Sequence, residues 1–292
     1  MPGLTTIKIL GNVKFLSHNL HLPTGFKHPQ GKPNADQYLQ SFKKPDDYNA
    51  VPQVIPPWFI PAEIPNKYYQ DTCDTIGKNF KDFHDAMIDA VTFAHNMWKL
   101  QAKFQNLNIM ALSAIGSPGC LDGPELESLI KSAPSAAAMM GNMAKHRDAV
   151  AAGVSKCFKN WQDQVTVPGL PWYPAFVAFP GPMAPPMPNI PMPLIACISS
   201  KMTDIIMPSS MASAMDDALD SSMKDKDPDK QYQALHDAIA TVLALAFLMW
   251  LPMQQVMLVL GKGPIPTFAP PFVPVGPVVG GQNIAVPGHL MT

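Results

Sequence analysis

A charge-free, proline-rich stretch at 165–195 constrains the fold of this chain more than any other feature. It contains ten prolines, four aromatic residues and three methionines, and no charged residue. Proline fixes the backbone and removes a hydrogen-bond donor, so a long helix is excluded here. An apolar ribbon left in water would be a large exposed hydrophobic patch, a feature typical of interaction sites. The sequence therefore predicts that this ribbon is covered by the rest of the fold, by other subunits or by lipid, and it favours contact with neighbouring chains.

The other prolines are also clustered. Of the 33 in the chain, ten lie in 1–65 and seven in 262–292. Disorder is a poor explanation, because 47% of the residues are hydrophobic and only 15% are charged, the reverse of the disordered signature. We therefore predict an extended Pro-rich N-terminal arm at 1–65, an apolar ribbon at 164–198 and an apolar Pro-rich C-terminal tail at 262–292.

Helical periodicity dominates the segments between the proline clusters. Apolar residues recur at steps of three or four over 66–115, and a second helical pattern follows in two pieces, 125–132 and 135–163. These patterns predict a long helical hairpin at 66–163 and a second helical region with a buried apolar helix at 199–261. The expected fold class is mainly α, with two helical pairs, long extended Pro-rich arms and little β.

A second uncharged run, 238–261, lies in the predicted second helical region. Its 24 residues match the roughly 20 that span a bilayer, so membrane insertion is one interpretation. Pro252, Gln254 and Gln255 interrupt the run and leave 14 unbroken residues, the length of a buried core helix. A buried helix is favoured, and insertion of 238–261 into a membrane stays the alternative.

Charge and cysteine usage bound the partners and the compartment. The chain has 21 Lys and Arg against 22 Asp and Glu, with no basic cluster, so nucleic acid is not an expected partner. Cys73, Cys120, Cys157 and Cys197 lack metal-ligand spacing and are interpreted as buried apolar residues in a reducing compartment. The first residues hold no apolar secretory signal, which predicts synthesis in a cytoplasm.

No catalytic or ligand-binding motif is present. Phosphate loops, dinucleotide-binding glycine motifs, nucleophile elbows and zinc-protease motifs are all missing. Asp225, Asp227 and Asp229 resemble the start of a calcium loop, but Lys230 and His236 occupy the positions that need Gly and Glu. We therefore expect no enzyme activity, no cofactor and no metal site.

Two segments, GLPWYPAFVAFPGPMAPPMPNIPMPL and PIPTFAPPFVPVGPVVGGQNIAVPG, resemble Pro-rich arms in structural proteins of tailed phages and contractile injection machines. The resemblance implies a structural component of a large symmetric assembly, such as a virion, baseplate, neck or shell, whose arms lace together copies of the chain and other subunits. It implies a location in the virion or injection particle, and the apolar run at 238–261 gives a membrane as the alternative. Rigid aromatic residues dominate interface energetics, which gives eight candidate anchors. They are Trp58, Phe59, Trp172, Tyr173, Phe176, Phe179, Phe268 and Phe272.

Overall fold

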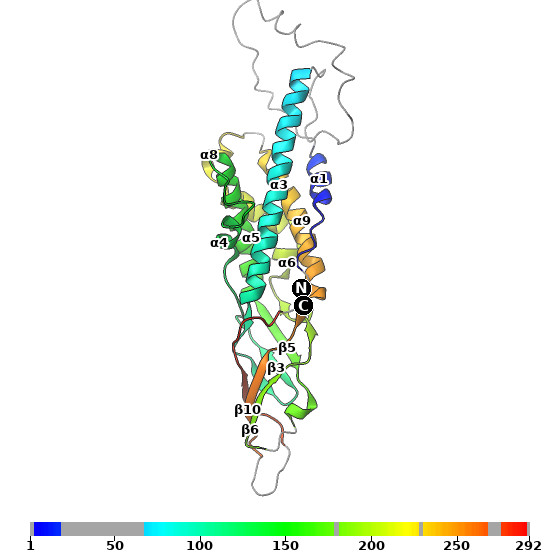
Figure 1. The fold of residues 1–292 in the computed structure, drawn as a ribbon, viewed down its shortest axis with the longest axis vertical. Coiled ribbons are helices and arrows are strands. Elements are labelled where there is room, and N and C mark those ends of the chain that lie inside the picture. Colours follow the sequence, from blue (N-terminus) through cyan, green and yellow to red (C-terminus); the bar gives the residue numbers. More distant parts are fainter. Residues whose placement is uncertain (1–2, 19–66, 178–180, 228–229, 268–275, 291–292) are drawn as a thin grey trace, which may run out of the picture.

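The fold divides into a helical half and a sheet half at opposite ends of an elongated molecule (Figure 1). The computed structural model describes residues 3–18, 67–177, 181–227, 230–267 and 276–290, with side chains of the long helix described from residue 75 onward. The described residues within 102–122, 164–200 and 254–290 make up the sheet half, and the other described residues belong to the helical half.

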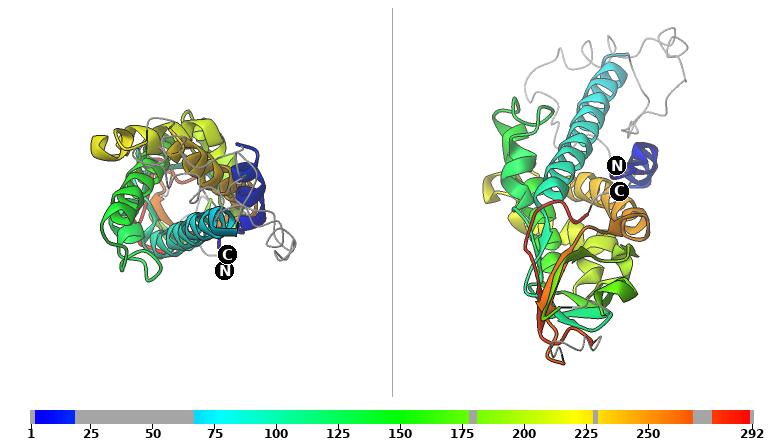
Figure 2. Two further views of the ribbon diagram at one scale, coloured as in Figure 1. Left: turned by 90° about the horizontal axis from the view of Figure 1, so that it is seen from above. Right: turned by 60° about the horizontal axis from the view of Figure 1, so that its bottom comes forward.

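Helices in the first half form a ring when seen from above (Figure 2, left). α5 packs against α4, α6 and α7, while α9 packs against α1, α3, α6 and α7. The helices are α1 (Lys8–Leu16), α3 (Lys67–Gln101), α4 (Leu126–Lys131), α5 (Asn142–Asp163), α6 (Met202–Ile206), α7 (Pro208–Ala218), α8 (Ser221–Lys224) and α9 (Tyr232–Met253). α9 is apolar on nearly every side and occupies the interior, as expected of a helix without a polar face.

The sheet half is built on a seven-stranded antiparallel sheet of order β6-β10-β11-β2-β3-β5-β8. Its strands are β2 (Asn108–Met110), β3 (Ser113–Gly116), β5 (Val165–Pro171), β6 (Met183–Pro188), β8 (Ile198–Ser199), β10 (Leu260–Pro264) and β11 (Gly281–Asn283). Two further pairs flank it, β1 (Lys103–Phe104) with β4 (Leu121–Asp122) and β7 (Met192–Pro193) with β9 (Gln255–Val256). Short 3-10 turns lie at Pro174–Phe176 and Leu194–Ala196.

The expected fold class, mainly α with little β, is wrong. The predicted ribbon at 164–198 supplies β5 to β8, and the predicted tail at 262–292 supplies most of β10 and all of β11. The helix expected over 66–115 ends at Gln101, and β1 to β3 follow. The predicted extended arm at 1–65 contains a helix, α1, and its residues 19–65 lie outside the described part of the chain.

Strand positions that do not need an N–H explain how so many prolines fit in a sheet. β6 is an edge strand that pairs with β10 on one side, and its prolines leave the open edge with few donors. Proline is tolerated at sheet edges and discourages pairing with further strands. In β5, Pro168 lies where the pairing with β3 shifts register between Val167 and Leu170. The prolines therefore shape this sheet instead of preventing it.

One core joins the two halves. Buried aromatic rings from α3, α5 and α9 meet around Trp98, whose Nε1–H donates to Gln162 Oε1 at 2.7 Å. The core continues without interruption into the sheet through Phe104, Ile109 and Trp172. The sheet half is thus anchored to the helical half by shared packing.

Candidate interaction surface

Charged residues are almost confined to the helical half. Of all Lys, Arg, Asp and Glu residues, only Lys103, Asp122 and Lys262 lie in 102–122, 164–200 and 254–292. Lys103 Nζ is 3.3 Å from Asp122 Oδ2, so these two charges compensate each other. Soluble globular domains average about 25% charged residues, to which the sheet half is a clear exception.

The exposed side of the sheet, which we call the outer face, is defined by its register. Lys262 pairs with Gln282, Gln282 with Asn108, and Asn108 with Ile115. Directly paired residues on neighbouring strands project to the same side, so these four form one row across β10, β11, β2 and β3. All four are exposed, and Ile115 is 54% exposed. Met110 and Met183 are also exposed. We include them in the outer face, which therefore combines large apolar side chains with two amides and one cation.

The opposite side of the sheet faces the core. Ile109, Ala114 and Leu170 are buried, and they occupy neighbouring positions on β2, β3 and β5. Gly261 lies on the same buried side, where an added Cβ would come within 2.5 Å of the Ile109 side chain. The sheet therefore has one filled side and one open side, and the exposed isoleucine and methionines belong to the open one.

A strained turn lies at the end of the sheet far from the helices. The β2–β3 hairpin turns through Ala111 and Leu112, and Ala111 has a φ of 53°, in the left-handed region that favours glycine. The Ala111 N–H donates to the Val278 carbonyl at 2.7 Å, and the Trp172 N–H donates to the Leu112 carbonyl at 2.7 Å. These bonds hold the turn with the Leu112 side chain exposed. A strained residue held by its surroundings is a feature often found at functional sites.

The predicted aromatic anchors separate into three groups. Trp172 and Phe176 are buried in the core of the chain itself, and Trp172 Nε1–H donates to the Met187 carbonyl at 3.0 Å. Tyr173 is 45% exposed, next to the strained turn. The remaining anchors lie outside the described residues: Trp58, Phe59, Phe179, Phe268 and Phe272. In this fold, Trp172 and Phe176 therefore stabilise the chain internally, and Tyr173 is available for contact.

Sequence reasoning missed the outer face. The helix expected over 66–115 covers Met110 and Ile115, which in the fold lie on two strands where they alternate with buried Ile109 and Ala114. Burial alternates with a period of two over 107–110 and 113–116, but hydrophobicity does not, because exposed Met110 and Ile115 are as apolar as the buried residues beside them. Periods of two and 3.6 are hard to separate over so few residues.

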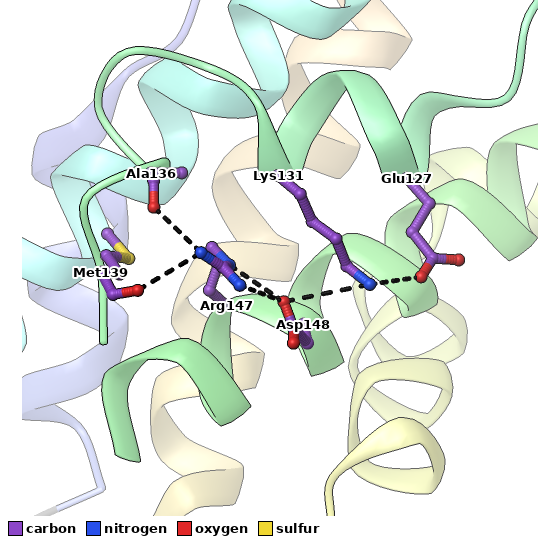
Figure 3. A network of polar contacts seen from close by, with 6 residues as sticks. All are labelled: Glu127, Lys131, Ala136, Met139, Arg147 and Asp148. Carbon is purple, nitrogen blue, oxygen red and sulfur yellow. Dashed lines mark hydrogen bonds and ion pairs between the residues drawn. The ribbon is translucent and has the colours of Figure 1, made fainter. Parts of the chain in front are cut away.

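Charges in the helical half are used in local networks, as Figure 3 shows. Arg147, the single arginine of the chain, donates to the carbonyls of Ala136 and Met139 and pairs with Asp148 at 2.8 Å. Lys131 Nζ lies 2.6 Å from Glu127 Oε1 on α4. The Arg147 side chain is largely buried, so this network braces the segment between α4 and α5.

A histidine cluster lies where α5, α7 and α9 meet. His236 Nδ1 is 2.7 Å from Asp216 Oδ1, and the rings of His146 and His236 are 6.1 Å apart. Burial lowers the pKa of His146 to about 4, and the nearby His236 acts in the same direction. An Asp–His pair can orient an imidazole for proton transfer. Among the described residues, no group of three or more His, Cys, Asp or Glu side chains could hold a metal ion.

The described cysteines are poor nucleophiles. Cys120, Cys157 and Cys197 are buried and free, and Cys73 lies among the residues whose side chains are not described. Burial raises the pKa of Cys120 and Cys157 to about 11 and that of Cys197 to about 12. The protonated thiol is unreactive.

The apolar helix proposed for membrane insertion is part of the core. α9 is the one described helix that is long and apolar enough to cross a membrane, and 72% of its most apolar window is buried inside the fold. Insertion would require α9 to leave its contacts with α1, α3 and α7.

No protein-family model, curated protein or solved structure matches the chain.

Proposed function

We propose that this chain is a non-catalytic subunit of a protein assembly and that its sheet half binds the neighbouring subunits. The observation that carries this proposal is the near-absence of charge from the sheet half, combined with exposed apolar side chains on the outer face. Interfaces that are permanently covered resemble an opened core, poor in charge and rich in aromatic residues and methionine. The helical half, which carries most of the charge, would remain in contact with water.

A virion or a contractile injection particle, assembled in the host cytoplasm, is the setting that the resemblance of the proline-rich segments favours. In this proposal the proline-rich segments do not act as the expected extended arms that connect neighbouring subunits. Within the described residues they build strands and bury Trp172 and Phe176, and so create an uncharged surface. A surface made of rigid strands loses little conformational freedom on binding, which favours a stable interface.

Site-specific photo-crosslinking in the cells that produce the chain tests this proposal. A photoreactive amino acid replaces Ile115 on the outer face, and a matched variant carries it at Ile9 on α1, which is 67% exposed. We expect Ile115 to give discrete crosslinked products, whose partners mass spectrometry identifies, and Ile9 to give few. Equal crosslinking from both positions, or none from Ile115, would contradict the proposal.

A further inference from the structure

We infer that the outer face binds a second copy of this chain, sheet against sheet, around a two-fold axis that runs parallel to the strands between β11 and β2. This inference rests on the proposed function and names the partner. Its geometry follows from the row Lys262, Gln282, Asn108 and Ile115 across four neighbouring strands.

The charge of the face limits the kind of partner. A surface of apolar side chains, two neutral amides and one cation cannot neutralise a highly charged partner, which would lose its hydration without gaining ion pairs. The complementary surface must also be poor in charge. The described part of the chain contains such a surface in the outer face itself, and a two-fold interface uses the same patch on both subunits.

The two amides make the centre of the row self-complementary. With the axis between β11 and β2, Gln282 of one copy lies opposite Asn108 of the other. Each side-chain amide has both donors and an acceptor, so the pair can satisfy itself. The same axis places Lys262 opposite Ile115 of the second copy, where the lysine stem can cover the isoleucine while the ammonium reaches water.

The spacing of the row keeps like charges apart. Three strand spacings of about 4.8 Å separate Lys262 from Ile115, so the two Lys262 side chains start about 14 Å apart along the row. That separation exceeds the screening length of about 8 Å at physiological ionic strength. A two-fold axis along the row would instead place Lys262 of one copy opposite Lys262 of the other. Among the residues that the structure describes, none forms an ion pair or a hydrogen bond with the Lys262 ammonium, and the side chain is exposed.

Two opposite substitutions at Ile115 test this arrangement in the purified full chain, with dimerisation measured by sedimentation velocity over a range of concentrations. Ile115→Lys places a cation opposite Lys262 of the second copy. It should raise the dissociation constant at least about tenfold, equivalent to about 1.4 kcal/mol. Ile115→Glu creates two symmetric Glu–Lys pairs and should leave dimerisation unchanged or tighter.

Ile9→Lys on α1 is the matched control and should have no effect. Ile115 and Ile9 are both exposed, so folding should be retained, which circular dichroism verifies.

The double variant Ile115→Glu, Lys262→Glu completes the test, because it restores like charges and should again weaken the dimer about tenfold. A chain that stays monomeric at every concentration would overturn the inference, as would equal weakening by Ile115→Lys and Ile115→Glu. Either result leaves the proposed function to be judged on its own test, because photo-crosslinks from Ile115 would then identify a different protein as the neighbour.

Discussion

The helical half and the sheet half share one core but expose different chemistry. The helical half places its charges in pairs and networks at the surface, such as the bridge between Lys159 and Asp163 at 2.6 Å. Both halves expose large apolar side chains, such as Ile9 and Met140 in the helical half and Ile115 and Met183 in the sheet half. The sheet half differs in charge, because it carries only one charge, Lys262, that no described residue compensates. Folding explains what is buried in both halves equally well. We propose that a neighbouring subunit accounts for this difference in surface charge.

The largest expected effect comes from breaking the core that the two halves share. Trp98→Ala removes a buried ring that contacts Phe158, Trp161 and Trp250, and it leaves the amide of Gln162 without its indole donor. We expect a loss of about 3–5 kcal/mol in the free energy of unfolding, measured by urea denaturation with circular dichroism. Tyr173→Ala, at an exposed position, is the control and should cost little. Separate unfolding transitions for the two halves would show that the core does not couple them.

Acid should weaken both halves through buried neutral histidines. Burial lowers the pKa of His95 to about 3 and that of His289 to about 4, from an ordinary value of 6.5. Between pH 6.5 and about 4, the unfolded chain therefore takes up protons that the folded chain does not, and the free energy of unfolding falls as pH falls. Each such histidine contributes about 1.4 kcal/mol per pH unit in this range.

His289→Asn isolates the contribution of the sheet half. His289 Nδ1 accepts the Phe104 N–H at 3.0 Å, and an asparagine carbonyl can replace that acceptor without titrating. The pH dependence of stability should become shallower by about one proton, as measured by urea denaturation between pH 4 and 6.5. An unchanged slope would show that His289 does not resist protonation in the fold.

A smaller effect is expected from the charge network of the helical half. Arg147→Lys keeps the positive charge but loses the planar fork that reaches the Ala136 and Met139 carbonyls and Asp148 together. We expect a loss of about 1–2 kcal/mol, determined by thermal unfolding. Lys131→Ala, which removes a more exposed ion pair, should cost less than about 1 kcal/mol. Equal losses would mean that Arg147 acts only through its charge.

The smallest effect concerns the strained turn of the sheet half. Ala111→Gly relieves a left-handed backbone conformation and should stabilise the chain by up to about 1 kcal/mol. Ala114→Gly, in the neighbouring strand, lacks this benefit and should destabilise it. Thermal unfolding of the two variants checks the comparison, and destabilisation by both would remove the argument that the turn is strained.

The sequence predicted the helices better than the sheet, for a physical reason. α5 lies within the predicted stretch 135–163 and α9 within the predicted helical region 199–261, where helical periodicity continues for many turns. The strands are only two to seven residues long, and proline and glycine interrupt their alternation. Register decides which side of the sheet is exposed, and pairs such as Asn108 with Gln282 join residues far apart in the chain. The near-absence of charge from these segments is visible in the sequence. The residues that form the outer face could not be predicted, because they depend on the register of the strands.

Carbene footprinting tests most directly whether the sheet half is covered by a neighbour. The isolated chain and the chain in its natural assembly are labelled under the same conditions. Mass spectrometry then quantifies the modification of three outer-face residues, Met110, Ile115 and Met183, and of two residues on α1, Ile9 and Val13. All five residues are exposed in the isolated fold. We predict that assembly protects the three outer-face residues and leaves the two α1 residues labelled. Equal labelling of the outer face in both states would contradict the account.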